Sequence, residues 1–317
     1  MYKYILFILA FYLVAPFLGH DFITINSLQI ETLHQIFWDI RVPRTIYAIF
    51  AGGALAISGV IFQNIFRNVL ADSYILGPST GASLALVIGN IFFAGTILQQ
   101  FMPLIGSLGV VIILLTMMMG KKMLNAQKIL LLGISLNFIF GSLVTALIIS
   151  YDSFQTLKLI RWTMGSLDII GSSGLLKFCS TTTILTSIVF YFSPQMNIYL
   201  LGNDTAMVKG LNIKKYLYLM IILGSLLVTL VVAELGPIGF VGLIAPHVVR
   251  LMVGNNHKKL IPYSFLLGGF ILVFADVLSR VFSETFVMPL GVVTSLLGAP
   301  AFIFLIFRRT SYSTDSV

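Results

Sequence analysis

The chain has 317 residues, of which 58% are hydrophobic and only 9% are charged, and its mean hydropathy is +1.02. Soluble domains carry about 25% charged residues, so this chain has too few solubilising side chains to cover a water-facing surface, which disfavours a soluble enzyme or a nucleic-acid binder. The net charge of +8 therefore has to be understood from where the cations lie along a membrane chain. A single cysteine, Cys179, excludes an internal disulfide and a thiolate metal cluster.

A membrane-spanning helix needs about 20 mostly apolar residues, and a search for such runs predicts an all-α bundle of about ten transmembrane helices. In chain order, the predicted cores are residues 4–19, 45–66, 74–97, 103–119, 129–149, 178–192, 216–234, 238–253, 260–279 and 288–307. No linker, low-complexity segment or soluble domain interrupts them, so residues 1–317 are expected to form a single transmembrane domain. No Ala-x-Ala cleavage site follows the first run, which is therefore expected to be retained.

Lysine and arginine are unevenly distributed between alternate loops, and positively charged loops stay in the cytoplasm. With the N-terminus inside, 13 of the 19 cations fall on the cytoplasmic side, namely Lys3, Arg67, Lys121, Lys122, Lys128, Lys209, Lys214, Lys215, Arg250, Lys258, Lys259, Arg308 and Arg309. The six on the outer side are Arg41, Arg44, Lys158, Arg161, Lys177 and Arg280. This pattern predicts a multi-pass protein of the cytoplasmic membrane with both termini in the cytoplasm.

Small residues recur at four-residue spacing in several predicted helices: Gly52 with Ala56, Gly81 with Ala85 and Gly89, and Gly291 with Ser295 and Ala299. Because lipid gives helices no hydrophobic reason to associate, faces that admit close backbone approach predict one compact bundle. A weak internal repeat is also visible. Gly59 precedes Arg67 by eight residues, as Gly242 precedes Arg250, and each arginine lies at a predicted cytoplasmic helix end.

Patterns that would carry catalysis are weak in this chain. The run from Gly77 to Gly81 matches Gly-x-Ser-x-Gly, but that nucleophile motif needs a strand-turn-helix elbow and a histidine partner, whereas here it begins a predicted membrane helix. The four histidines are scattered and no phosphate-binding loop is present. We therefore expect a protein that is not an enzyme and binds no metal or cofactor of its own. If ATP drives it, another chain must hydrolyse the ATP.

Two groups of charges lie in or beside predicted helices, where an ionisable side chain is expensive and suggests a function. Asp276 and Arg280 are four residues apart on one helical face and can form a structural ion pair. The alternative is that Asp276 orients Arg280 toward an external partner. Arg41 and Arg44 are either ordinary cations at a helix end or, with Arg280, a ring that meets carboxylates on a docking protein.

Two sets of motifs follow one another from Arg41 to Phe307. The first set is Arg41-Val-Pro-Arg-Thr45, Gly53-Ala-Leu-Ala-Ile-Ser-Gly59, Gln63, Arg67-Asn-Val-Leu-Ala-Asp72, Leu76-Gly77 and Gly81-Ala82. The second set is Gly239-Phe-Val-Gly-Leu-Ile-Ala-Pro-His247, Arg250, Asn256-His-Lys258, Leu260-Ile-Pro262, Ala275-Asp276 with Arg280, Pro289-Leu-Gly291 and Gly298-Ala-Pro300. In this order, the motifs resemble the FecCD-type, BtuC-like family of permeases that import iron chelates, haem and vitamin B12.

The resemblance implies a type II ABC importer permease with ten helices per subunit in the inner membrane of a prokaryote. Its implied partners are a second permease copy, as a homodimer or a heterodimer, two cytoplasmic ATPase subunits that use the ATP, and an extracytoplasmic substrate-binding protein. The implied sites are binding-protein docking at Arg41, Arg44 and Arg280, ATPase coupling at Gly202, Ala206, Met207 and Gly210, a cytoplasmic gate at Asn68, Leu70, Ala126 and Gln127, and a pathway at Asn137, Trp162 and Met164.

The implied function is transport of a metal chelate, with an iron(III)-siderophore as first candidate and haem, cobalamin or molybdate as alternative cargoes. The competing classes are a stand-alone secondary carrier or channel and, after that, a membrane-embedded enzyme. The family usually has prolines where this chain has Val69 and Ser73, so we expect a softer turn at the gate.

Overall fold

The computed structural model describes residues 2–19, 22–24, 29–118, 126–149, 153–167, 171–172, 174–282 and 288–313, and their regular structure is entirely helical. The longer helices are α1 (Tyr2–Val14), α3 (Val42–Phe66), α4 (Pro78–Phe92), α5 (Ile97–Met118), α6 (Ala126–Ile148), α8 (Leu175–Tyr191), α11 (Ile213–Leu235), α12 (Val241–Val253), α13 (His257–Val281) and α14 (Leu290–Ser313). The shorter elements are η1 (Ala15–Phe17), α2 (Glu31–Gln35), the π-helical turn η3 (Ile36–Arg41), α7 (Ser153–Thr163), α9 (Ser193–Tyr199) and α10 (Asn203–Val208).

Each predicted run overlaps one of the longer helices, and the predicted all-α fold is confirmed. Within the described residues, five helices are long and apolar enough to cross a membrane. The number rises to six if α8 and α9, which meet at 50°, form one bent span. Four further apolar helices are shorter, so the count of ten spans stays a prediction.

One boundary difference lies before α4. The sequence predicts a helix from residue 74, whereas α4 begins at Pro78. Gly77 precedes it with φ of 90°, a left-handed conformation that glycine adopts without steric penalty. Because Tyr74, Ile75 and Leu76 are apolar, hydropathy cannot distinguish this turn from the helix that follows.

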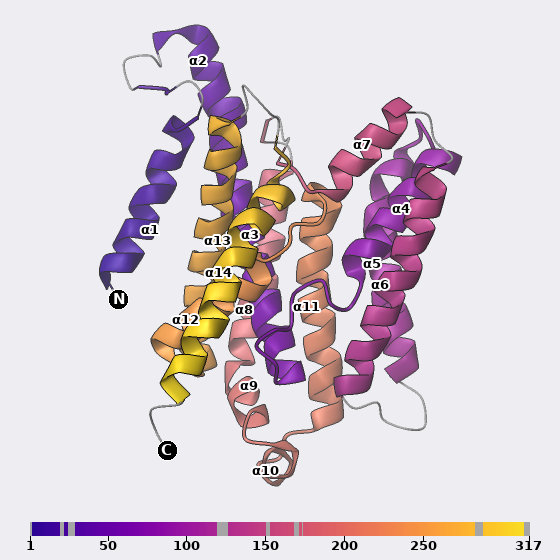
Figure 1. Cartoon of the computed structure of the whole chain (residues 1–317), viewed down its shortest axis with the longest axis vertical. Helices are drawn as coiled ribbons and strands as arrows, with labels where there is room; N and C mark the ends of the chain where they lie inside the picture. The colour runs from indigo at the N-terminus through magenta and orange to yellow at the C-terminus, as the bar shows by residue number, and fades with distance from the viewer. Residues whose placement is uncertain are drawn as a thin grey trace.

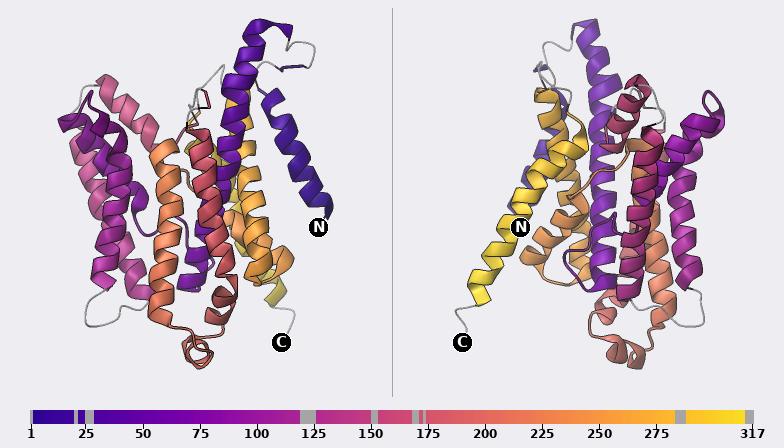
Figure 2. Two further views of the ribbon diagram at one scale, coloured as in Figure 1. Left: turned by 180° about the vertical axis from the view of Figure 1, so that it is seen from behind. Right: turned by 45° about the vertical axis from the view of Figure 1, so that its right-hand side comes forward.

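Helix α3 lies at the centre of the bundle, against α13, α11, α12 and α8 (Figures 1 and 2). Helices α4, α5 and α6 form a second group on the other side of α11. The start of α1, the C-terminal end of α14, and α10 lie toward one end of the bundle, and α2 and α7 lie at the other. Which end faces the cytoplasm stays a prediction.

Helices cross α3 where small residues let two backbones touch. A Cβ atom added at Gly59 would lie 1.8 Å from the carbonyl oxygen of Gly242 in α12, and one added at Gly52 would lie 2.2 Å from that of Gly268 in α13. A Cβ atom at Gly81 of α4 would likewise lie 2.7 Å from a carbonyl oxygen of α5. The predicted small-residue faces at Gly52 and Gly81 are therefore confirmed as helix contacts.

A buried ion cluster joins α3 and α13 near the end that carries α2. The side chain of Asp276 is completely buried. Arg44 Nε donates a hydrogen bond to its Oδ1 at 2.6 Å, and Arg280 Nε lies 3.1 Å from its Oδ2. Arg280 Nη2 also donates to a carbonyl oxygen of η1 at 3.2 Å, and Arg41 Nη1 donates to two others, each at 3.4 Å. The cluster therefore also holds the end of α1 against the bundle.

Replacing Gly59 by alanine should push α3 away from α12, because the added methyl group would overlap the carbonyl group of Gly242. We expect a loss of about 1–3 kcal/mol in stability, the usual cost of overpacking, seen as a lower unfolding temperature in detergent. Gly109→Ala in α5 is the matched control, because nothing lies within 4 Å of its Cβ position. Equal unfolding temperatures for the two variants would contradict a close crossing at Gly59.

Asp276→Asn should destabilise the fold by about 3–5 kcal/mol, because it leaves buried guanidinium groups without their carboxylate. The measurement is thermal unfolding of the purified chain. Glu31→Gln is the control, because Glu31 is an exposed carboxylate at the same end of the bundle. If the two variants unfold at the same temperature, the cluster does not stabilise the fold.

Candidate functional site

The three arginines expected to dock a binding protein lie together but are largely covered. The side chains of Arg44 and Arg280 are 16% and 11% exposed, and Arg41 is 9% exposed. Their hydrogen bonds run to Asp276 and η1, whereas the sequence suggested an internal partner only for Arg280. The cluster therefore places three guanidinium groups and one buried carboxylate together close to the surface.

The residues expected to contact an ATPase form a short hairpin at the opposite end of the bundle, around α10 (Figure 1). Gly202 and Gly210 flank α10 with φ angles of 106° and 80°, which glycine adopts most readily. Ala206 is buried, whereas Met207 and Val208 are 56% and 89% exposed. Exposed apolar side chains on a short helix beyond the long helices favour a protein contact.

A cluster of polar side chains lies where α9 meets α3, α11 and α13, and sequence reasoning did not single it out. His257 Nε2 lies 3.2 Å from Asn64 Nδ2, and His257 Nδ1 lies 2.7 Å from Asn197 Oδ1. The hydroxyl group of Tyr216 donates to Asn64 Oδ1. These contacts join α9, which leads into α10, to α3, α11 and α13. The available signal was a polar residue inside an apolar run, because a buried amide such as Asn64 requires partners.

The two pairs of residues expected at the gate lie in different elements. Asn68 and Leu70 are exposed in the loop after α3, where Asn68 Oδ1 accepts a hydrogen bond from Leu70 N at 2.9 Å. Ala126 and Gln127 begin α6, and Gln127 is exposed. Among the described residues, hydrogen bonds do not join the two pairs, so their gating function stays a prediction.

Residues 73–76 continue the loop after α3 and are anchored by side chains. Ser73 Oγ donates to a carbonyl oxygen of α3 at 2.8 Å, and the hydroxyl group of Tyr74 accepts from Ile238 N at 2.9 Å. Asn137 Nδ2 of α6 lies 3.3 Å and 3.2 Å from two carbonyl oxygens of the loop. The serine that replaces a proline thus anchors the loop through its hydroxyl group. Asn137, expected on the pathway, holds the same loop.

A cavity of about 660 Å³ lies between α14, the start of α4, the end of α7 and three loops. Met164, expected on the pathway, lines it, whereas Trp162 packs against the core. Ser295 and Ala299 line this cavity together with Gly291. The predicted small-residue face of α14 therefore borders open space as well as its neighbours in the bundle. The lining has no charged side chain. Elsewhere in the described ranges, no group of three His, Cys, Asp or Glu side chains could hold a metal ion.

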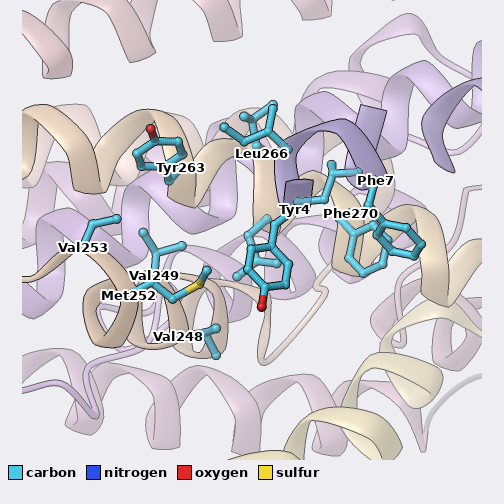
Figure 3. Close-up of a pocket in the computed structure, with 12 residues that line it drawn as sticks. Tyr4, Phe7, Val248, Val249, Met252, Val253, Tyr263, Leu266 and Phe270 are labelled. Carbon is cyan, nitrogen blue, oxygen red and sulfur yellow. The ribbon is translucent and has the colours of Figure 1, made fainter. Parts of the chain in front are cut away.

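A second cavity, of about 480 Å³, lies between α1, α12 and α13 (Figure 3). Its lining is aliphatic and aromatic and includes Phe7, Met252 and Phe270, while Tyr4 and Tyr263 supply the hydroxyl groups. It shares no lining residue with the cavity beside α14. Because solutes are oriented by a few polar groups within an apolar pocket, the cavity beside α14, with Ser and Thr side chains, is the better candidate for a transport path.

The sequence matches the family model described as the FecCD transport family over residues 4–308. The hemin transport system permease protein HmuU of Yersinia pestis is 35% identical over 290 residues, which cover 90% of this chain and 86% of HmuU. The vitamin B12 import system permease protein BtuC of Photorhabdus laumondii is 33% identical over 314 residues, which cover 97% of this chain and 92% of BtuC.

The fold also matches a solved structure of a metal-chelate type ABC transporter in an inward-facing conformation. The TM-score is 0.85 at 29% identity, over 97% of this chain and 100% of that chain. The family model spans nearly the whole sequence, and the relatives are more than 30% identical over most of their own length. This chain therefore belongs to the FecCD transport family, as a multi-pass membrane permease.

Proposed function

We propose that this chain is the permease subunit of an ABC importer that moves a metal chelate from an extracytoplasmic binding protein into the cytoplasm. Partner subunits would hydrolyse the ATP. The observation that carries the proposal is the match to a metal-chelate type ABC transporter across 97% of the chain. The uncharged cavity beside α14 supports it, since its volume of about 660 Å³ lies in the range of small-molecule sites.

An iron(III)-siderophore is the first candidate cargo, because the matched solved structure is that of a metal-chelate type ABC transporter. Haem and cobalamin are the direct alternatives, because HmuU and BtuC are named for hemin and vitamin B12 transport. In all three, an organic ligand already surrounds the metal ion. A lining without carboxylates suits such cargo, because carboxylates are themselves metal ligands that would compete with the chelator.

A second copy of the chain would complete the path. Helices α6 and α14 leave large apolar side chains exposed, among them Phe138, Leu296 and Ile303. Leu296 also lines the cavity, and α6 holds the loop that borders it through Asn137. Apolar helix faces beside an open cavity favour contact with another permease, and we propose a homodimer on this basis.

Two ATPase subunits would contact the permeases at α10. Met207 and Val208 present apolar surface, while Ala206 packs inward and holds the helix against the bundle. The polar cluster around Asn64 and His257 joins this end to several long helices. Displacement of α10 would therefore tilt those helices and expose the cavity alternately to the two sides of the membrane.

The binding protein would dock over the arginine cluster, because guanidinium groups attract acidic residues across distances of about 10 Å at moderate salt. Replacing all three arginines by glutamate would place their carboxylates beside Asp276, so lost docking would be confused with unfolding. Arg41 is the better probe, because it hydrogen bonds to the carbonyl oxygens of η1, whereas Arg44 and Arg280 pair with Asp276.

Arg41→Glu should raise the concentration of binding protein needed for half-maximal ATPase stimulation in reconstituted complexes. We expect about a tenfold increase, since close charge pairs across an interface contribute about 1.5 kcal/mol or more. Arg161→Glu in α7 is the control, because it makes the same charge change at an exposed site of the same end. Equal weakening by both variants would contradict docking at the arginine cluster.

Proteoliposomes that contain the chain with its ATPase and binding protein should accumulate cargo only when ATP is supplied on the ATPase side. A ferric siderophore, hemin, cyanocobalamin and molybdate would each be offered to the binding protein, and uptake of the bound compounds would be measured. Uptake by the chain alone would contradict the importer and favour a secondary carrier. Binding of hemin or cobalamin alone would exclude the siderophore as cargo.

A further inference from the structure

Arg67 ends α3 in a conformation that its residue type does not favour. Its φ and ψ are 47° and 36°, in the left-handed region. Helices commonly end with glycine in this conformation, because a Cβ atom is strained there. A strained residue persists only where the surrounding contacts hold it in place, so the contacts of the guanidinium group are informative.

The Arg67 guanidinium group bridges the two sides of the turn between α9 and α10. Nη2 donates to the carbonyl oxygen of Tyr199, the last residue of α9, at 2.8 Å. It also donates to Oδ1 of Asn203, the first residue of α10, at 2.7 Å. Cζ lies 4.4 Å from the centre of the Tyr199 ring, and the Tyr199 hydroxyl group donates to Ile65 O in α3 at 3.2 Å. Gly202, with φ of 106°, lies between the two acceptors along the chain.

The backbone of Arg67 leads directly into the loop expected to gate the path. Asn68 N donates to Gln63 O at 3.2 Å, and Ala71 N donates to Asn68 O at 3.1 Å, so residues 67–71 form a continuous hydrogen-bonded turn. Two residues later, Ser73 anchors the loop to α3. A force applied to the Arg67 side chain therefore acts on a short segment that is held at its far end.

We propose that Arg67 transmits displacement of α10 to the loop of residues 68–77, and so couples the partner ATPase to the gate. The inference rests on the proposed function, in which α10 contacts the ATPase. Arg67 is a positioning residue, since it acts through Asn203 and Tyr199 on one side and through its own backbone on the other. A capping role alone would require only the left-handed backbone, which glycine supplies with less strain.

The first experiment compares Arg67→Gly with the wild type in proteoliposomes that contain the ATPase and the binding protein. Glycine relieves the backbone strain, so the variant should assemble with the ATPase and unfold at the wild-type temperature or above. The number of cargo molecules moved per ATP hydrolysed should fall about tenfold, within the range typical of coupling between two sites. A wild-type ratio for this variant would overturn the inference.

Asn203 tests the other end of the contact. Asn203→Ala removes the acceptor and should uncouple transport as Arg67→Gly does, whereas Asn203→Asp keeps an acceptor and adds charge, so it should stay coupled. The double variant Arg67→Gly with Asn203→Ala should be no worse than Arg67→Gly alone, because Arg67→Gly already removes the contact with Asn203. Independent losses that add in the double variant would overturn the inference.

Arg250→Ala is the matched control. Arg250 lies in the last turn of α12 and donates to Gln63 of α3 at 2.9 Å. Unlike Arg67, its backbone is helical and does not lead into the loop of residues 68–77. Uncoupling by this variant equal to that of Arg67→Gly would assign the effect to general disturbance and overturn the inference. If wild-type chain neither binds the ATPase nor transports, the proposed function itself fails. Normal wild-type transport with a coupled Arg67→Gly variant rejects the inference alone.

Discussion

Close backbone contact along α3 is the constraint on which the rest of the structure depends. Lipid is as apolar as a leucine side chain, so helices in a bilayer associate through packing and hydrogen bonds rather than through exclusion of water. Gly52 contacts α13 and Gly59, about two turns further along, contacts α12. Three helices are thereby fixed relative to one another, and the C-terminal end of α3 has a defined position from which Arg67 can reach α9 and α10.

The two ends of this packed unit use different polar chemistry. At the end near α2, three guanidinium groups surround the buried carboxylate of Asp276 or hold η1. Breaking such a pair costs about 3–5 kcal/mol, which favours a fixed arrangement. At the end near α10, neutral amide, imidazole and hydroxyl groups of residues such as Asn64 and Tyr216 exchange hydrogen bonds, each contributing only about 0.5–1.5 kcal/mol. Rearrangement within this neutral cluster is therefore less expensive than separation of the ion cluster around Asp276.

Sequence reasoning succeeded where the signal was local. Hydropathy located each long helix, and four-residue spacing placed Asp276 and Arg280 on one face, where the structure brings them to 3.1 Å. It could not show that Arg44, 232 positions before Asp276, contacts the same carboxylate, because long-range pairing leaves no periodic trace. The repeat that begins at Gly59 and Gly242 was visible, but only the structure shows that the two glycines touch.

Other predictions depended on the resemblance to the family, or on conformations and partner subunits that a single chain does not contain. The hairpin around Gly202 was located through the family's motifs, because glycine-rich turns of this kind occur in many loops. The gate residues Asn68 and Gln127 lie in separate elements, and any closure between them involves movement or a second copy. Asn137 lies in a helix that the sequence predicted, but its function was predicted only in part. Its amide group also holds the loop at Tyr74, which the sequence did not indicate.

The π-helical turn η3 has a consequence for the register of the chain before α3. A π turn holds one residue more than an α turn, and each residue rotates an α-helix by about 100°. This extra residue sets the direction of Phe37, whose ring lies 4.8 Å from that of Phe17 in η1. Deleting one residue here would restore regular helix but swing residues 31–36 around the axis. The irregular turn thus aligns the segment before α3 with the end of α1.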